Sequence, residues 1–344
     1  MKAAGSAPLL IGIDWRTTMK IAFAGLRHGH IFALYEMAKN HSLYEIVGSF
    51  EDHPDYIASA EKQGVTVNYK TLDELVNDPS VEAVAIGSCF GDRGSVAIEA
   101  LKHGKNVICD KPLCTSLEDL YEIERLAKER GLFVSCMYTM RFEKNMVAVR
   151  ELIRSGALGE IVNVYFGGQH PLQYGRRPAW YYEDGKHGGV FNDIAIHGID
   201  LLSFWFDGDI DSIQAARSWN KYADCESGFH DCGQFMLTLK NGAGVISDVS
   251  YAIPDGVEFG LPYYWQFFVW GTGGCLGFAL SDKEIKYYVK GEKEPKTLEV
   301  KPISHDYLTD FYNLVNGSSD VVLPMNEVFR STENTLKIQV FADK

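Results

Sequence analysis

The chain has 344 residues, which is too long for one ordinary hydrophobic core and suits two domains. Its net charge of −13 argues against nucleic acid or an anionic membrane as a main partner, because both bind clustered lysines and arginines. No apolar run approaches the roughly 20 residues of a membrane span. The seven cysteines are scattered and lack zinc-like spacing, so we expect reduced thiols in a cytoplasmic protein.

Residues 1–18 are expected to be an N-terminal extension, because strand-like sequence begins at Met19, which could itself be a start. An apolar strand over 20–24 then leads into Gly25-Leu26-Arg27-His28-Gly29-His30, and apolar residues follow at helical spacing. A strand, a glycine turn and a helix in this order are typical of dinucleotide-binding proteins. The pyrophosphate binds the free amides at the start of the helix. Arg27 and His30 stand where glycines are usual, so a turn that merely joins a strand to a helix would look similar.

A second strand over 44–50 ends at Glu51, about 20 residues beyond the glycine turn. A carboxylate at this position can accept hydrogen bonds from a ribose diol and would repel a 2′-phosphate. We therefore expect NAD as the cofactor, with NADP as the alternative, because Arg27 and His53 are cations nearby. The alternative is that Glu51 is an ordinary exposed acid in a loop and contacts no cofactor.

Further strands and helices alternate beyond Glu51. The strands are expected over 81–86, 106–109 and 132–137, and the helices over 95–103 and 117–130. This alternation predicts an α/β fold with a doubly wound parallel sheet, a Rossmann domain over 19–139. Ligands bind outside the carboxyl ends of such strands, which would bring Ser88-Cys89-Phe90 and Asp110-Lys111 to the glycine turn and Glu51.

Lys111 directly follows an apolar strand and precedes Pro112. The proline favours an extended conformation for the lysine, which would project from a stiff strand end. Most lysines in turns are simply solvated, and that is the alternative here. The position of Lys111 at the carboxyl edge of the sheet favours a role in a ligand-binding site.

Residues 140–344 are expected to form an α+β domain with a large, mainly antiparallel sheet. Asn241-Gly242 predicts a hairpin turn between strands over 234–240 and 244–251. The strand over 263–270 is apolar on both faces, so both faces must be covered. A second subunit is one cover, and we expect a homodimer or homotetramer formed through this sheet. Other strands are expected over 161–166, 275–280, 284–290 and 297–300, and helices over 146–153, 305–316 and 325–342.

Gly188-Gly189 is followed by Asp193 and His197, four residues apart at the start of a predicted helix. On an α-helix their β-carbons would lie about 5–6 Å apart on one face, as an oriented acid–base pair. Alternatively, Asp193 caps the helix and His197 is an ordinary core histidine.

The segment 169–189 is rich in aromatic and basic residues, and long ordered loops of this kind are usually functional. Its candidates for contact with a polar, hydroxylated substrate are His170, Tyr174, Arg176, Trp180, Tyr182, Lys186 and His187. A metal site built from His170, His187, Asp193 and His197 is a weak alternative, because no two of these histidines show a helical ligand spacing, and no metal is expected.

The order and spacing of these motifs resemble the Gfo/Idh/MocA oxidoreductases, named for glucose–fructose oxidoreductase and inositol dehydrogenase. The resemblance rests on the glycine turn, on residues 104–113, on residues 138–142 and on Gly188-Gly189 with Asp193, His197 and Asp200. Asp110 departs from the family's usual glutamate, and Ser88-Cys89-Phe90 with Arg93 departs from Thr-Pro-Asn followed by histidine.

The resemblance implies Lys111, Asp193 and His197 as the catalytic set. Cofactor contacts would come from residues 25–30, Glu51, Ser88, Cys89, Phe90, Asp110 and Lys111, and substrate contacts from Tyr138, Arg141, His170, Trp180, Asp193 and His197. The implied reaction is hydride transfer between NAD(P) and a secondary alcohol of a sugar, cyclitol or related polyol. Two alternatives stay open. One is a non-catalytic NAD-binding sensor or partner-binding protein, and the other is a redox-neutral, NAD-dependent glycoside-cleaving enzyme.

Overall fold

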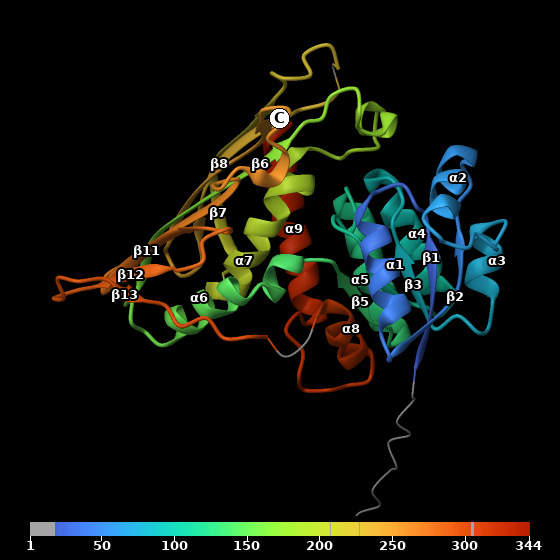
Figure 1. The fold of residues 1–344 in the computed structure, drawn as a ribbon, viewed down its shortest axis with the longest axis horizontal. Coiled ribbons are helices and arrows are strands. Elements are labelled where there is room, and N and C mark those ends of the chain that lie inside the picture. Colours follow the sequence, from blue (N-terminus) through green and yellow to red (C-terminus); the bar gives the residue numbers. More distant parts are fainter. Residues whose placement is uncertain (1–17, 207, 227, 304–305) are drawn as a thin grey trace, which may run out of the picture.

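The computed structural model describes residues 18–344 except 207, 227, 304 and 305. The described residues form two layered units that lie side by side (Figure 1). A parallel sheet with flanking helices makes up the N-terminal unit, and a large sheet with helices on one face makes up the C-terminal unit. The predicted extension lies outside the described residues except for Thr18.

Five parallel strands in the order β2-β1-β3-β4-β5 form the N-terminal sheet. These strands are β1 (Met19–Ala24), β2 (Tyr44–Phe50), β3 (Ala83–Ile86), β4 (Asn106–Cys109) and β5 (Val134–Cys136). The connecting helices are α1 (His30–Asn40), α2 (Pro54–Lys62), α3 (Leu72–Asn77), α4 (Arg93–Lys102) and α5 (Leu117–Arg130). The doubly wound parallel sheet is therefore confirmed. The sequence does not predict α2 and α3, which are short and bury only one and two residues.

Local signals explain why the predicted elements form where they do. The hydroxyl of Ser116 accepts a hydrogen bond from the Asp119 amide and caps α5, and Gly131 ends the helix in the left-handed conformation. All four residues of β3 are buried, as expected for a central strand of a parallel sheet.

Eight strands form the C-terminal sheet, in the order β13-β12-β11-β10-β6-β9-β8-β7. They are β6 (Ile161–Pro171), β7 (Ile210–Trp219), β8 (Cys232–Leu239), β9 (Gly244–Ile253), β10 (Trp265–Gly271), β11 (Gly274–Ala279), β12 (Lys286–Val289) and β13 (Lys296–Thr297). Only the β6–β9 pair is parallel among these, so the mainly antiparallel sheet is confirmed. The sequence does not predict β7, because two register shifts interrupt its alternating pattern.

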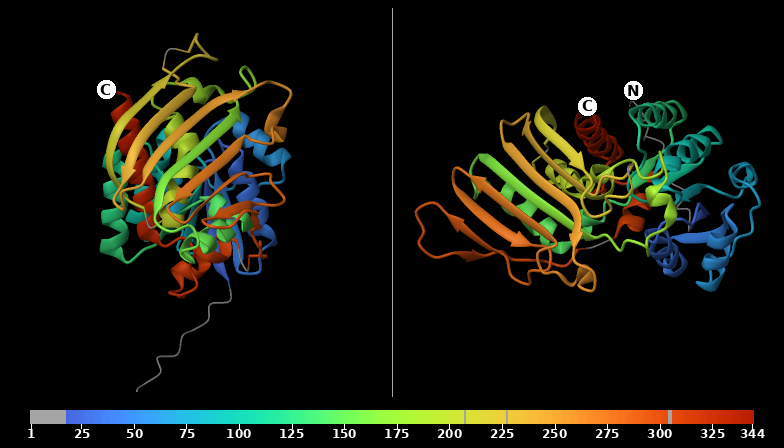
Figure 2. Two further views of the ribbon diagram at one scale, coloured as in Figure 1. Left: turned by 90° about the vertical axis from the view of Figure 1, so that its left-hand side faces the viewer. Right: turned by 90° about the horizontal axis from the view of Figure 1, so that it is seen from above.

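Helices line one face of this sheet, and the described residues place none on the other (Figure 2). The lining helices include α6 (Lys144–Arg154), α7 (Ile196–Phe206) and α9 (Met325–Ala342). On β10, Trp265 and Phe267 are buried against the helices, whereas Phe268 and Trp270 are exposed on the opposite face. The strand is therefore apolar on both faces, as predicted, and the helices cover one of them.

The last two helices join the two cores. Leu308 and Phe311 of α8 (Tyr307–Val315) pack into the N-terminal core, as do Val328 and Phe329 of α9, whereas Ile338 of α9 packs into the C-terminal core. Among the helices built from the described residues, none has the length and apolar character needed to cross a membrane. The two units thus share helix α9, which contributes side chains to both cores.

Candidate active site

Lys111 lies just beyond the carboxyl end of β4 and is 2% exposed. Its ammonium donates a hydrogen bond of 2.7 Å to the main-chain oxygen of Asp193 and a second one to the Asp193 carboxylate. A lysine has three N–H donors, so one remains for a ligand. The contact between Lys111 and Asp193 therefore connects the two units.

Asp193 lies in a π-helical turn over Phe191–Ala195 that leads into α7. Gly189 precedes this turn with a φ of 96°, and a β-carbon there would lie 2.1 Å from the Gln339 side chain of α9. Only glycine allows this backbone and this close approach. Single π-turns occur frequently at functional sites.

The carboxylate of Asp193 contacts Lys111 and Tyr251 rather than His197. The sequence pattern predicts an oriented Asp193–His197 pair on an ordinary α-helix, and this pairing is absent among the described side chains. The physical reason is twofold. The π-turn changes the helical spacing, and Lys111, just beyond β4, and Tyr251 of β9 already occupy the carboxylate oxygens. Asp193 is also not a helix cap.

Tyr251 of β9 and His187 complete a short hydrogen-bonded chain behind Asp193. The Tyr251 hydroxyl donates to the Asp193 carboxylate, and His187 Nε2 lies 2.9 Å from the same hydroxyl. Because the hydroxyl proton points to Asp193, His187 Nε2 must donate to the tyrosine oxygen. This arrangement orients Asp193 from the side opposite Lys111.

The charges of the site follow from these contacts. Burial opposes ionisation of Asp193, but the Lys111 ammonium and the nearby His187 outweigh it and hold the pKa of Asp193 well below its usual value. Burial, reinforced by the Asp193 charge, raises the pKa of Tyr251 well above its usual value. Asp193 is thus a carboxylate and Tyr251 a neutral donor at neutral pH.

His197 begins the second turn of the helical segment and is 6% exposed. Its Nδ1 is buried without a hydrogen-bond partner among the described residues. The ring packs edge-on to Trp265 at 6.1 Å. Burial lowers the pKa of His197 well below its usual value, and Lys111 and two other histidines lower it further. The ring is therefore neutral and has hydrogen-bonding capacity to offer a ligand.

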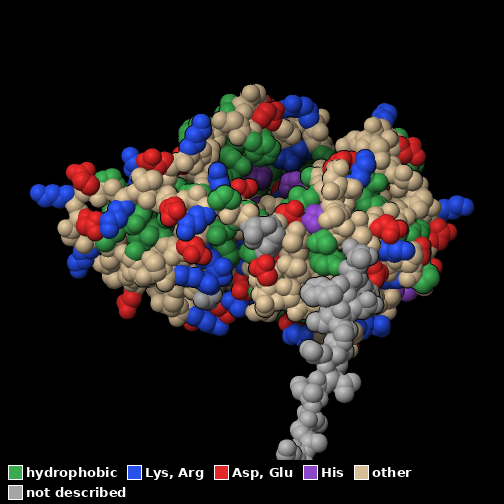
Figure 3. Space-filling view, turned by 60° about the horizontal axis from the view of Figure 1, so that its bottom comes forward, with side chains coloured by type: hydrophobic (Ala, Val, Ile, Leu, Met, Phe, Trp, Pro, Cys, Tyr) green, Lys and Arg blue, Asp and Glu red, His purple; other side chains and the backbone are tan. Residues whose placement is uncertain are grey.

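His170 near the end of β6 faces the same region and packs against Tyr251 and Trp265. Burial lowers its pKa to about 3, although Asp193 acts in the opposite direction. Figure 3 shows a hollow between the two units in which histidine side chains and cationic side chains gather. The structure thus brings His170, Lys111, Asp193 and His197 together as expected.

Folding stability should fall on acidification because His170 is neutral in the folded protein. Its pKa is about 3 when folded and about 6.5 when unfolded, so the unfolded chain binds the extra proton. The contribution of His170 is complete above pH 6.5 and falls as the pH decreases, by about 2 kcal/mol at pH 5. Urea unfolding at pH 7 and pH 5 measures this loss, and His170→Asn should reduce it. An equal pH dependence in both proteins would contradict the expectation.

The glycine turn provides part of a dinucleotide cradle. Gly25 has a φ of 78°, and a β-carbon there would lie 2.6 Å from the Ser88 amide nitrogen. The amides of Arg27 and His28 already donate to the Gly87 oxygen. Those of Gly29 and His30 donate no hydrogen bond within the described part of the chain, and a β-carbon on Gly29 would meet open space. The start of α1 therefore fits a pyrophosphate.

Glu51 lies at the predicted place after β2 and accepts hydrogen bonds from the glycine turn. Its carboxylate accepts hydrogen bonds from the amides of Leu26, Asp52 and His53 and from the Arg27 side chain, at 2.7–3.0 Å. Three of these donors are on Oε1 and one is on Oε2, so Oε2 can accept a further hydrogen bond. Glu51 holds the glycine turn in place, and its role at a ribose, with the preference for NAD, stays a prediction.

Aromatic residues of the segment 169–189 pack onto the nucleotide-binding edge. Trp180, 3% exposed, lies 4.9 Å from the Phe90 ring, and its indole N–H donates to the Arg27 oxygen at 3.4 Å. An ion pair between Lys186 and Asp92 fixes the same segment. Cys89 and Phe90 are buried, so these residues line the edge as packed side chains.

Tyr138 and Arg141 have structural partners rather than positions facing Lys111. The Tyr138 hydroxyl lies 2.7 Å from the Thr332 hydroxyl, and both groups are buried. Arg141 is fully buried and forms two hydrogen bonds with the Asp200 carboxylate, at 2.6 and 2.8 Å, and one with Glu327. Because Glu327 and Thr332 belong to α9, these side chains fix the shared helix.

Arg141→Met should destabilise the protein by about 3–5 kcal/mol, because Asp200 would stay buried without its cation. Chemical unfolding measures this change. The matched control is Arg125→Met on α5, whose exposed ion pairs with Glu122 and Glu129 should contribute less than about 1 kcal/mol. Equal unfolding free energies for the two variants would contradict this assignment.

Sequence reasoning overlooks two residues of the site. Tyr251 lies in a strand that is unremarkable in sequence, and Arg177 stands beside the candidate Arg176. The Arg177 guanidinium lies 4.8 Å from the centre of the Tyr251 ring and donates to the main-chain oxygens of Pro171 and Leu172. A buried tyrosine opposite the predicted acid becomes evident only when β9 is placed beside β6.

Family models match both units of the chain. The family model described as "Oxidoreductase family, NAD-binding Rossmann fold" matches residues 19–138, and that of the GFO/IDH/MocA C-terminal domain matches residues 146–276. Myo-inositol 2-dehydrogenase of Thermotoga maritima is 28% identical over 239 residues, which are 68% of this chain and 70% of that protein.

Solved structures share the fold along nearly the whole chain. A putative oxidoreductase from Erwinia carotovora atroseptica superposes with a TM-score of 0.83 at 22% identity, over 94% of this chain and 99% of the other. Levoglucosan dehydrogenase in complex with NADH and levoglucosan superposes with a TM-score of 0.78 at 17% identity, over 95% and 97% of the two chains. The two family matches, in the predicted order and over both units, show that the chain belongs to the GFO/IDH/MocA family of NAD(P)-dependent oxidoreductases.

Proposed function

We propose that this protein transfers a hydride between NAD(P) and a secondary alcohol of a cyclitol, sugar or related polyol, with Lys111, Asp193 and His197 as its catalytic set. The observation that carries the proposal is a buried lysine–aspartate pair beside a neutral histidine whose Nδ1 has no hydrogen-bond partner among the described residues. The unused donor on Lys111 and the unpaired imidazole are complementary to a hydroxyl group. The names of the related inositol and levoglucosan dehydrogenases support the same substrate class.

Each residue has a distinct task in this mechanism. Lys111 donates its remaining N–H to the reacting oxygen and stabilises the developing alkoxide in a buried site. His197 accepts the hydroxyl proton as general base. Asp193 keeps Lys111 in position and is itself held by Tyr251. NAD(P), bound at the glycine turn and the start of α1, supplies the hydride acceptor.

The domains divide this work. We propose that residues 19–139 bind the cofactor and that residues 140–344 bind the substrate and form the subunit interface. The seven free cysteines support a reducing compartment, the cytoplasm.

A substrate panel tests the proposed reaction. Purified protein is incubated with inositols, aldoses, anhydro sugars and sugar acids, with NAD and NADP in parallel, and absorbance at the reduced nicotinamide band is followed. We expect at least one compound of this panel to reduce NAD or NADP. Product formation without net reduced cofactor would instead indicate redox-neutral glycoside cleavage, and cofactor binding without any turnover would indicate a sensor.

We also propose that two copies associate through the open face of the eight-stranded sheet. Met236, Ile246 and Trp270 are exposed there and, with Tyr165, line a hollow of about 580 Å³. Exposed apolar patches of this kind mark interaction surfaces. A second copy would provide the cover that β10 needs on its outer face.

Replacing two of these residues with acids should separate the subunits. Ile246→Glu with Trp270→Glu would place four negative charges in a symmetric dimer interface, so we expect a monomer by light scattering where the wild type is a dimer or tetramer. Val340→Glu on α9 is the control, because Val340 is about as exposed but lies off the sheet. A wild-type monomer, or unchanged assembly of the double variant, would disprove the interface.

A further inference from the structure

Arg177 lies beside the catalytic set without a carboxylate partner among the described residues. It is half-buried, and its guanidinium carbon lies 4.8 Å from the centre of the Tyr251 ring and 4.7 Å from the centre of the Tyr181 ring. We propose that Arg177 and the Tyr181 hydroxyl bind a carboxylate group of the substrate. This inference rests on the proposed function and narrows its substrate class to sugar acids.

Two hydrogen bonds to the main chain leave one edge of the guanidinium unused. Arg177 Nε donates to the Leu172 oxygen and Nη2 donates to the Pro171 oxygen, each at 2.6 Å. A guanidinium has five N–H donors, so the remaining ones are the second N–H of Nη2 and both N–H groups of Nη1. Nη1 has no partner among the described residues, yet the protein does not enclose it. The Nη1–Nη2 edge is a planar fork that can bind a carboxylate through two parallel hydrogen bonds.

The Tyr181 hydroxyl is a second donor without a protein partner. The residue is 2% exposed, but its hydroxyl forms no hydrogen bond with any described residue and is not sealed off from solvent. Burial raises the pKa of Tyr181 well above its usual value, and the negative charge of Asp193 raises it further. The hydroxyl therefore keeps its proton at neutral pH and can donate a hydrogen bond to an anion.

Two aromatic rings connect these donors to the catalytic set. The centre of the Tyr181 ring and the Lys111 ammonium each lie 5.6 Å from the centre of the Phe90 ring. The Arg177 guanidinium lies over the Tyr251 ring, whose hydroxyl donates to the catalytic carboxylate. A molecule of the size of a hexose can therefore place one hydroxyl at Lys111 and a second group, a few bonds away, at Arg177.

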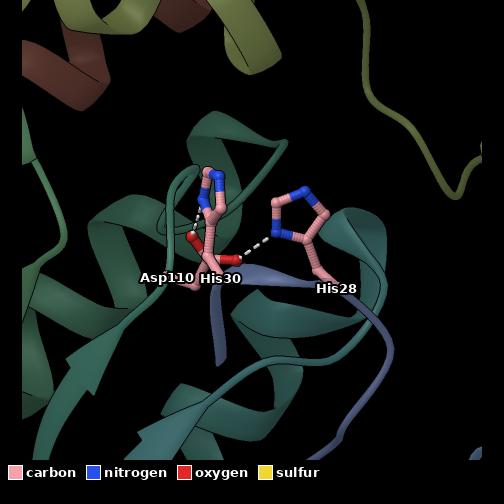
Figure 4. A group of neighbouring side chains, drawn as sticks. All are labelled: His28, His30 and Asp110. Carbon is pink, nitrogen blue, oxygen red and sulfur yellow. Dashed lines mark hydrogen bonds and ion pairs between the residues drawn. The ribbon is translucent and has the colours of Figure 1, made fainter. Parts of the chain in front are cut away.

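The buried carboxylates of the site already have other partners. Asp110 accepts a hydrogen bond from Arg93 at 2.8 Å and lies 2.6 and 3.1 Å from the Nδ1 atoms of His28 and His30 (Figure 4). The catalytic aspartate is occupied by its lysine and tyrosine partners. Arg177 therefore has no ion pair with a carboxylate in the described part of the chain. A ligand can supply the missing negative charge.

The charge balance of the site favours an anion with a single negative charge. Lys111 and Asp193 neutralise each other, and burial lowers the pKa of His170 and of His197, so that both rings are neutral. The positive charge of Arg177 is thus uncompensated, although the chain as a whole carries a net charge of −13. A phosphate ester carries a charge of about −1.5 to −2 at pH 7, whereas a carboxylate carries one negative charge. One carboxylate therefore matches the uncompensated cation.

Matched sets of acidic, neutral and phosphorylated sugars test this assignment. Glucose and galactose are compared with their uronic acids, aldonic acids and 6-phosphates, and kcat/KM is measured with NAD and with NADP. We expect a larger kcat/KM for at least one acid than for its parent sugar. Arg177→Gln should lower this acid-to-parent ratio about 10- to 100-fold, because hydrogen bonds to a charged group are lost. Arg177→Lys keeps the charge but lacks the fork and should lower the ratio less.

Two further variants sharpen the kinetic test. Tyr181→Phe removes only the hydroxyl and should also lower the acid-to-parent ratio. Arg217→Gln is the matched control, because Arg217 likewise lies over an aromatic ring, that of Trp219 at 4.0 Å, but is exposed on β7. Its acid-to-parent ratio should equal that of the wild type. Circular dichroism confirms that each variant is folded.

Calorimetry measures the same preference without turnover. Protein saturated with NADH or NADPH is titrated with each acid and with its parent sugar. The wild type should bind at least one acid more tightly than the parent sugar, and Arg177→Gln should lose that difference. Acid binding of this kind without any turnover would contradict the proposed reaction and leave the carboxylate site standing. Turnover of neutral sugars with the same ratio in all variants would do the opposite.

Three results would overturn the carboxylate site. The first is a wild type that prefers no acid in kinetics or in calorimetry, or an acid-to-parent ratio that is equal in the wild type and both Arg177 variants. The second is a preference for the 6-phosphates over the acids that Arg177→Gln abolishes, which would make the ligand a phosphate. The third is weaker NADH or NADPH binding by Arg177→Gln in the absence of sugar, which would assign Arg177 to the cofactor.

Discussion

Lys111→Met should lower kcat by about 100- to 1000-fold while NAD(P)H binding persists. The side chain is buried, and its ammonium is the nearest cation to the Asp193 carboxylate. Removing it takes away the group that we expect to stabilise the developing alkoxide, and electrostatic groups of this kind contribute roughly 100- to 1000-fold each. Steady-state kinetics with the substrate found in the panel gives kcat, and nucleotide fluorescence gives cofactor affinity.

The same substitution leaves Asp193 buried without its partner, which should cost about 3–5 kcal/mol of folding stability. The double variant Lys111→Met with Asp193→Asn removes both charges and should recover part of that stability without recovering activity. A folded, inactive double variant therefore separates catalysis from folding. Near-normal kcat in either variant would refute the role of Lys111.

His197→Gln should lower kcat by about 100- to 10,000-fold through loss of the general base. Its effect on stability should be small, because His197 donates and accepts no hydrogen bond within the described structure. This contrast between a large kinetic and a small thermodynamic effect is what distinguishes a substrate-facing histidine from a structural one. Kinetics and thermal unfolding of the same preparation measure both.

His187→Gln is the informative comparison for that variant. His187 is also buried, yet it donates to Tyr251 and so supports Asp193 indirectly. We expect a smaller loss of kcat and a larger loss of stability than for His197→Gln. The reverse order would show that His197 is the structural histidine of the two.

The position of Lys111 could be predicted because the topology of a parallel sheet brings all its carboxyl ends to one edge. The bounds of α5 could be predicted as well, since Ser116 and Gly131 are local signals. Neither prediction depended on contacts between distant parts of the chain. Both agree with the structure.

The surroundings of Asp193 could not be predicted because they depend on long-range packing. The π-turn follows from the close approach of Gly189 to Gln339, which lies 150 residues away along the chain. Tyr251 reaches Asp193 only because β9 pairs with β6 in the sheet. Glu51 occupies its predicted place, yet its hydrogen bonds turn inward to the glycine turn.

Transfer of deuterium tests the central claim most directly. The protein is incubated with oxidised cofactor and polyols deuterated at their carbinol carbons, and the recovered nicotinamide is analysed by mass spectrometry. This readout detects hydride transfer even when the cofactor is recycled in place. The proposed function predicts deuterium in the nicotinamide ring with wild-type protein and a drop to background with Lys111→Met. Absence of label with every polyol, or equal label in the two proteins, would contradict it.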